Sequence, residues 1–127
     1  MFLVFILALI TPTIYQRLNF WLNKKSFYEI NLREKSGLQI HHGHFGIIIL
    51  FVTTIFIMFL EKNLLLVSLL GFGWGLLLDE IAPSLMMPSK NRELELAVYE
   101  KSGRATFLIF ISVIILVTIL YFFQGKY

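Results

Sequence analysis

Three histidines and two carboxylates lie at the ends of two neighbouring apolar segments. His41, His42 and His44 begin one segment, and Asp79 and Glu80 close the next. One short connection joins the segments, and His44 and Glu80 are equally distant from its middle residue. If the segments are antiparallel helices, His44 and Glu80 lie at the same depth, with His41 about 4.5 Å further out. The spacing therefore predicts one polar site at one end of a helical hairpin.

The residue types in this cluster suit a metal ion. His41 and His44 are spaced i, i+3 and share a helix face, whereas His42 is rotated by about 100°. Asp79 and Glu80 also point about 100° apart, so we expect only one of them to face the histidines. Imidazole and carboxylate ligands bind Zn, Fe or Mn, and such a set leaves coordination positions open for catalysis or transport. The second carboxylate would act as a general base or orient a ligand histidine.

Two other interpretations of the cluster remain open. One is a hydrogen-bonded histidine–carboxylate pair that fixes the hairpin without a metal. The other is a set of unconnected polar residues at the membrane interface. The pattern lacks the His-Glu-x-x-His spacing of zinc proteases, but ionisable residues in membrane helices are costly and often functional. Gly43 and Gly46 remove bulk beside the histidines, so a ligand or another backbone can come close.

The elements that must position this cluster are membrane helices. The chain has 127 residues, of which 57% are hydrophobic, and a mean hydropathy of +0.78. Its apolar residues gather in four uncharged runs near the length that a membrane helix needs. We expect a single transmembrane domain over residues 1–127, with spans at 2–16, 38–60, 64–82 and 105–123. The first run resembles a signal peptide in length, but it has no basic start and no small-residue cleavage site, so a retained helix is expected.

Charge and cysteine content narrow the function further. Nine of the eleven basic residues fall in two connections, 16–37 and 81–104, on one side of the membrane. The positive-inside rule makes that side cytoplasmic, with both termini outside and the His/Asp/Glu cluster inside. This predicts a multi-pass plasma-membrane protein, in contact with the lipid bilayer and without a nucleic-acid partner. The absence of cysteine excludes disulfides and thiolate chemistry.

The predicted fold is an all-α integral membrane four-helix bundle with short interfacial helices. Its second and third helices form a tight antiparallel hairpin. Ser68, Gly71 and Gly75 make a small-residue face, for which we expect close packing of the second and third helices, with a homodimer face as the alternative. Pro83 and Pro88 are expected to end the third helix, before a short helix at 91–101.

Secondary candidates for the site follow the third helix on the same side of the membrane. They are Glu95, Tyr99, Glu100 and Arg104. Tyr99 and Glu95 are i, i+4 partners that could complete the site, and Arg104 could position a phosphate headgroup. A solvated helix face is the alternative interpretation.

These motifs carry a resemblance. The stretch Ile-His-His-Gly-His-Phe-Gly at 40–46, the glycine-rich helix that ends Leu-Asp-Glu at 78–80, and the Tyr-Glu and Gly-Arg pairs at 99–104 resemble a loose group of small uncharacterised prokaryotic integral membrane proteins. The resemblance covers roughly residues 38–106. It implies a shared membrane architecture and brings no established activity with it.

Three classes of function fit the sequence. The first is a metal-dependent membrane enzyme that acts on a lipid or another membrane-embedded substrate, with His41 and His44 as ligands and Asp79 and Glu80 as ligand and general base. The second is a non-catalytic assembly or partner subunit, which includes a homo-oligomer. The third is a transporter of protons or metal ions, although the middles of the four spans carry no charged path.

Overall fold

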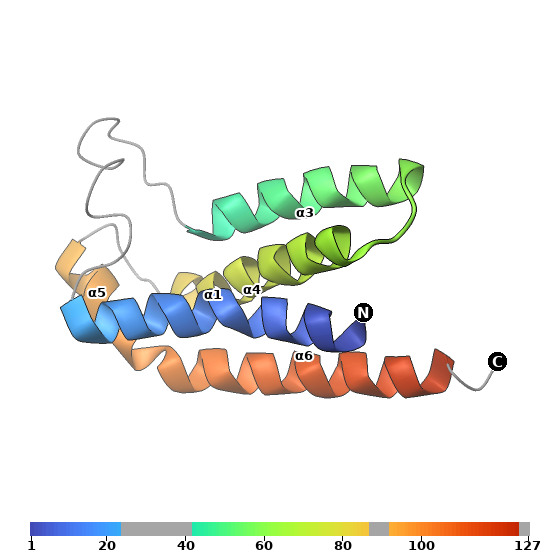
Figure 1. Ribbon diagram of the computed structural model, residues 1–127. Helices are drawn as coiled ribbons and strands as arrows, with labels where there is room; N and C mark the ends of the chain where they lie inside the picture. The colour runs from blue at the N-terminus through green and yellow to red at the C-terminus, as the bar shows by residue number, and fades with distance from the viewer. Residues whose placement is uncertain (24–41, 87–91, 125–127) are drawn as a thin grey trace.

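The chain is all-helical wherever its structure is described. A computed structural model describes residues 1–23, 42–86 and 92–124, and the regular elements in these ranges are helices (Figure 1). They are α1 (Phe2–Asn23), α3 (His42–Phe59), α4 (Leu64–Met86), α5 (Arg92–Lys101) and α6 (Gly103–Gln124). Each of α1, α3, α4 and α6 is long and apolar enough to cross a membrane, which confirms the predicted class of a multi-pass α-helical membrane protein.

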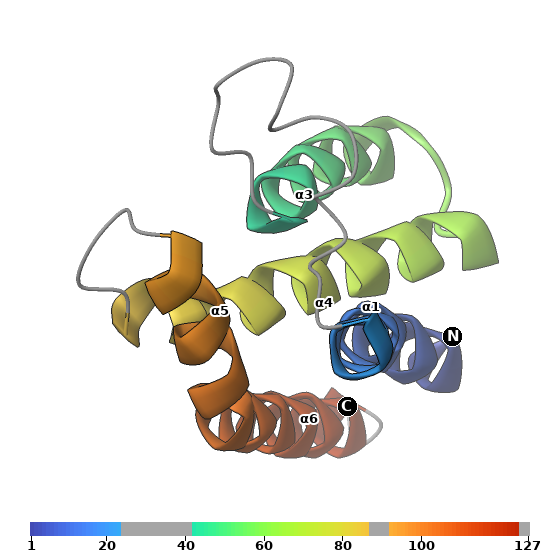
Figure 2. The same ribbon diagram turned by 90° about the vertical axis from the view of Figure 1, so that its left-hand side faces the viewer.

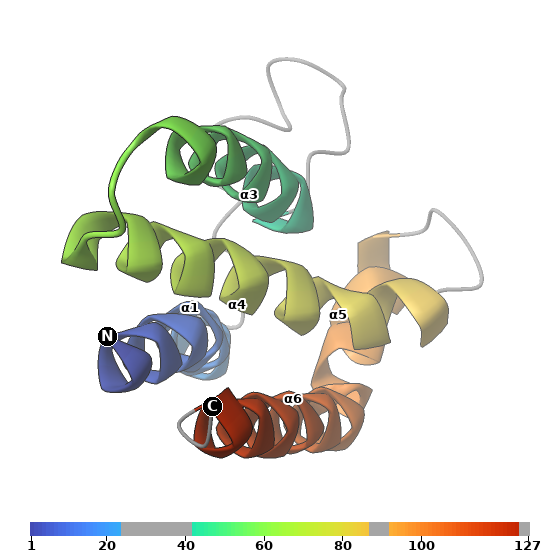
Figure 3. The same ribbon diagram turned by 90° about the vertical axis from the view of Figure 1, so that its right-hand side faces the viewer.

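Helix α4 lies at the centre of the arrangement. Helix α3 packs on one side of it and α1 on another, while α6 lies along α1 and α4 (Figures 2 and 3). Helices α1 and α4 run in the same direction, and α3 and α6 run in the opposite one (Figure 1). The short helix α5 lies where α1 and α4 end, and we call this the α5 end. The start of α1 and the end of α6 lie at the opposite end of the bundle.

Two of the four helices continue past their expected ends. Helix α1 extends through Arg17 to Asn23, so this arginine belongs to a membrane helix and not to a linker. Helix α4 continues through Pro83 to Met86, and the expectation that Pro83 ends it was wrong. Proline has no N–H, so the helix continues past Pro83 only by leaving the backbone carbonyl of Asp79 without its usual helical donor. Pro88 lies outside the described residues.

The small-residue face of α4 packs against α1. A Cβ atom added at Gly71 would lie 2.6 Å from the Phe5 carbonyl oxygen, and one at Gly75 would overlap the Leu9 carbonyl oxygen. The expected packing of this face against the preceding helix was therefore wrong, and the homodimer alternative fails because α1 already covers the face. The reason is steric: only glycine leaves room for the backbone of α1 to approach so closely.

Different glycines bring α3 and α4 together. A Cβ atom at Gly46 would lie 2.7 Å from the Gly73 carbonyl oxygen, and one at Gly73 would lie 3.0 Å from Leu50 Cγ. This confirms the expected close approach of another backbone at Gly46.

The helices bury a small core and leave broad apolar faces outside. Leu9, Leu78 and Phe110 form the core cluster of α1, α4 and α6. Large apolar side chains remain exposed on all four long helices, including Leu7, Phe51 and Phe107. Such faces are stable against lipid tails, so these helices contact the bilayer.

Candidate functional site

A fully buried carboxylate lies at the α5 end of the bundle. Asp79 has no exposed surface and stands on the face of α4 that carries Gly71 and Gly75, one turn further along. Partners from three other helices surround it: Arg17 of α1, His42 of α3 and Tyr99 of α5. A buried charge is tolerated only when it is paired and hydrogen-bonded, and Asp79 meets both conditions.

Arg17 joins the helices around this carboxylate. Its Nε donates to Asp79 Oδ1 at 3.2 Å, and its Nη1 donates to the Tyr99 carbonyl oxygen at 2.6 Å. Its Nη2 donates to Thr106 Oγ1 at 2.8 Å and to Ser102 Oγ at 3.3 Å. One guanidinium therefore holds α4, the last turn of α5 and the first turn of α6, which suits its planar fork of donors.

Tyr99 is the second support of Asp79. Its hydroxyl donates to Asp79 Oδ2 at 2.8 Å, and its ring lies under the Arg17 guanidinium, 3.9 Å from Cζ. Phe20 packs edge-on against the same ring at 5.0 Å. Burial, and next the negative charge of Asp79, raises the pKa of the Tyr99 phenol well above its ordinary value of 10.0. The phenol is therefore a hydrogen-bond donor at physiological pH.

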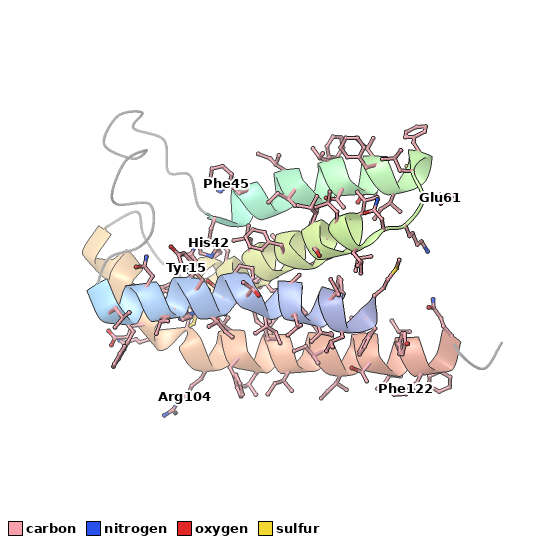
Figure 4. The ribbon with its side chains drawn as sticks, viewed as in Figure 1. Tyr15, His42, Phe45, Glu61, Arg104 and Phe122 are labelled. Carbon is pink, nitrogen blue, oxygen red and sulfur yellow. The ribbon has the colours of Figure 1, made fainter. Side chains whose placement is uncertain are left out.

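His42 is the histidine that meets the carboxylates. Its Nε2 lies 3.1 Å from Asp79 Oδ2 and 3.2 Å from Glu80 Oε2, and it stands between α3 and α4 (Figure 4). We expected only one carboxylate to face the histidines, and this expectation was wrong, because His42 lies beside both. The glycine contact with α4 sets the rotation of α3: His42 is one turn before Gly46 and shares its face, whereas His44 lies about 200° from Gly46.

Glu80 connects the buried network to an open groove. Its side chain is 12% exposed, and its Oε1 accepts a hydrogen bond of 3.3 Å from Ser84. The groove has a volume of about 310 Å³ between α3 and α4, and Glu80, His44, Ile47 and Leu77 are among its lining residues. Gly43 makes room for Glu80, because a Cβ there would lie 2.9 Å from Glu80 Cβ. The groove is thus an apolar slot with a carboxylate and an imidazole in its wall.

The charges of the site are arranged around His42. Arg17 pairs with Asp79, and Glu80 is a second carboxylate beside it. The Nε2 atom of His42 lies 3.1 Å from Asp79 Oδ2 and 3.2 Å from Glu80 Oε2. An imidazole and a carboxyl group in such contact are groups that can take up and release a proton at the groove.

Three of the other predicted site residues are exposed in the described part of the chain. His44 is exposed and lines the groove, and Glu100 is exposed on α5. Arg104 is exposed in the first turn of α6 and points away from the other helices (Figure 4). His41 and the side chain of Glu95 lie outside the described part of the chain. The structure therefore brings together His42, Asp79, Glu80 and Tyr99 from the predicted set.

Three members of the network were missed in the sequence. Arg17 was read only as a topology signal, and Ser102 and Thr106 were not considered. Two signals in the sequence point to Arg17. The small-residue face of Gly71 and Gly75 continues at the same spacing to Asp79, and an acidic residue on a helix contact face needs a cationic partner. The nearest basic residue at the matching end of a neighbouring span is Arg17.

The side chains around Asp79 can be compared with the ligand set of the expected metal site. Within residues 1–23, 42–86 and 92–124, no group of three or more His, Cys, Asp or Glu side chains is arranged to hold a metal ion. Asp79 is already engaged by a guanidinium and a phenol, and a metal ion on the same carboxylate would face the charge of Arg17.

Fold and site together define a multi-pass membrane protein with a buried Arg–Asp–Tyr–His network beside a lateral groove. Comparison with family models, curated proteins and solved structures finds no match for the chain, so its function rests on the site itself.

Proposed function

We propose that this protein is a small membrane enzyme that transfers a proton to or from the polar group of a lipid or another membrane-embedded substrate. The observation that carries the proposal is the position of His42 Nε2, 3.1 Å from the buried Asp79 and 3.2 Å from the groove carboxylate Glu80. The groove supplies an apolar slot for the body of the substrate. The α5 end is proposed to face the cytoplasm, because nine basic residues fall on that side.

Each residue has a distinct role in this proposal. Glu80 is the general acid or base, since it opens on the groove. As a base, Glu80 takes a proton from the substrate and passes it to His42 Nε2. In the reverse direction, protonated His42 gives its proton to the Glu80 carboxylate, which passes it to the substrate. Asp79 is a positioning residue that orients His42, and Arg17 and Tyr99 hold Asp79 in place. His44 contacts the polar group of the substrate from the opposite wall.

A divalent metal ion remains part of the proposal only at the groove. Glu80 and His44 line the groove together and are its imidazole and carboxylate ligands in that version of the mechanism. Elemental analysis of metal-loaded protein tests it: about one Zn, Fe or Mn per chain, lost in a His44→Ala/Glu80→Gln variant, would support a groove metal. No ion in either protein would leave the metal-free mechanism described above.

Lipid turnover tests the proposed activity. The wild type, Glu80→Gln and the matched control Glu100→Gln are reconstituted in vesicles of prokaryotic polar lipids, and lipid species are followed by mass spectrometry. We expect one species to change with the wild type and the control but not with Glu80→Gln. Unchanged lipids in all three preparations would overturn the lipid-enzyme proposal.

The assembly-subunit alternative is favoured by one observation, the saturation of Asp79 by partners from three other helices. In that case the network serves stability, and Glu80→Gln would alter association with a partner without affecting any turnover. Crosslinking of the reconstituted protein distinguishes the two roles. Proton or metal-ion transport would require a path through the apolar middles of α3, α4 and α6, which carry no charged residue.

A further inference from the structure

A second cavity lies at the end of the bundle opposite to the proposed active site. It has a volume of about 430 Å³, and residues of α1, α3, α4 and α6 line it. Its wall is almost entirely apolar, with Phe5, Ile57, Leu66, Leu70 and Leu120 among the lining side chains. The size lies within the range of small-molecule sites.

Polar groups border this cavity at the helix ends. Lys62, Tyr121 and Gln124 are its polar lining residues, and each lies at or near the end of a membrane span. The connection that carries Lys62 is held by hydrogen bonds on both sides. Leu60 N donates to the Phe56 carbonyl oxygen at 2.8 Å, and Leu66 N donates to Asn63 Oδ1 at 2.9 Å, which caps α4. The turn that carries Lys62 is thus fixed where the two spans end.

The interior of the cavity needs an apolar occupant. The cavity is open at its side, and water against its apolar wall finds too few hydrogen-bond partners. The surrounding helices contact lipid tails, so an acyl chain is the occupant at hand. The cation at the mouth then selects the headgroup, because a Lys at the membrane surface attracts anionic lipids.

We infer that this cavity binds one anionic phospholipid, with an acyl chain between α1, α4 and α6 and the phosphate group at Lys62. The ring of Phe2 stacks on Tyr121 at 4.5 Å between centroids and joins α1 to α6 beside the chain. The positive end of the α4 dipole, which begins at Leu64, adds to the attraction for the phosphate. The site is separate from the groove at Glu80, so its failure would not affect the proposed function.

Native mass spectrometry tests this inference. Delipidated protein in detergent is mixed with phosphatidylglycerol or phosphatidylcholine of identical acyl chains, and bound lipid per chain is counted. We expect one phosphatidylglycerol to be retained, with a preference of about fivefold over phosphatidylcholine. Lys62→Gln should remove the preference, and the control Arg104→Gln, which removes a cation at the opposite end, should keep it.

A cavity-filling variant and a free anion separate the two parts of the ligand. Leu70→Trp should lower retention of both lipids, because the indole occupies the space of the acyl chain. Inorganic phosphate should not compete with phosphatidylglycerol, because it lacks the chain. Three results would each overturn the inference. The wild type could retain both lipids equally, Lys62→Gln could keep the preference, or inorganic phosphate could displace the bound lipid. Circular dichroism confirms that the variants are folded, and Lys62 is exposed, so its replacement does not disturb packing.

Discussion

Arg17 and Asp79 form an ion pair across the contact of α1 and α4, with 3.2 Å between Nε and Oδ1. The side chain of Asp79 is fully buried, and that of Arg17 is 23% exposed. The pair lies at the end of the glycine face that joins these two helices, so the same interface contains the closest backbone approach and the principal buried charge. Packing and electrostatics at this interface therefore depend on each other.

Removal of either charge should destabilise the protein strongly. Asp79→Asn or Arg17→Gln leaves the other charge without its partner in a largely buried site, and we expect a loss of about 3–5 kcal/mol. The double variant should lose clearly less than the sum of the two. Unfolding of the purified protein in detergent, monitored by circular dichroism, measures these differences.

The exposed Arg104→Gln serves as the control and should change stability by no more than about 0.5 kcal/mol. Losses below about 1 kcal/mol in both single variants would show that the pair acts like a surface ion pair, contrary to the buried geometry.

Much of the fold could be predicted from the sequence because the membrane imposes simple requirements. Uncharged runs near the length of the bilayer core define α1, α3, α4 and α6, and the polar stretches between them define the connections. The course of α1 past residue 16 could not be read in this way, because helix length beyond the apolar core is set by contacts such as those of Arg17. The continuation of α4 past Pro83 likewise depends on packing, since buried neighbours can hold a helix together across a proline.

The location of the site was predicted from the sequence, but only some of the residues that form it were. Asp79 and Glu80 were found because ionisable residues in membrane helices are costly and often functional, and the histidines because they are concentrated in one stretch. The choice of His42 depends on the rotation of α3, which Gly46 sets through its contact with Gly73. Arg17 was missed because its role needs the parallel packing of α1 and α4, a long-range feature that local spacing does not encode.

Alanine substitutions should lower stability at a glycine that packs against α1 but not at a glycine with open space around it. Gly75→Ala places a methyl group against the Leu9 carbonyl and 2.7 Å from Pro12 Cγ, so the helices must separate. We expect a loss of about 1–3 kcal/mol, the usual cost of overpacking. Gly103→Ala is the matched control, because its nearest atom, Arg17 Nη1, lies at 3.6 Å. Equal stability of both variants in detergent unfolding would contradict the tight α1–α4 interface.

Tyr99 should make the fold sensitive to alkaline pH. Its pKa is raised in the folded state, so the folded protein keeps the phenolic proton at pH values where the unfolded chain loses it. The contribution is complete below the unfolded pKa near 10 and is lost as pH rises through the higher folded value. Stability should therefore fall above about pH 10, and more steeply in the wild type than in Tyr99→Phe.

Absorbance at 295 nm supplies an independent measure of the same ionisation. In folded protein, Tyr99→Phe should leave the absorbance rise below about pH 11 unchanged, because Tyr99 is not yet ionised there. In protein unfolded by denaturant, the same variant should lose one tyrosine's share of the rise. A smaller rise in the folded variant would show that Tyr99 ionises in the ordinary range and that its hydrogen bond to Asp79 is absent.

His42 and His44 should differ in both stability and chemistry. His42→Ala removes the imidazole that lies 3.2 Å from Glu80 Oε2, so it opens space beside that carboxyl group. A membrane-soluble carbodiimide adds to a protonated carboxyl group, and we expect it to modify Glu80 several-fold faster in His42→Ala than in the wild type. His44→Ala should leave that rate and the stability unchanged, because His44 lies on the exposed wall of the groove.

Peptide mass spectrometry locates the adduct, and Asp79 should remain unmodified in the wild type because it is buried and paired with Arg17. If His44→Ala instead accelerated the modification and His42→Ala did not, His44 would be the histidine that shields Glu80.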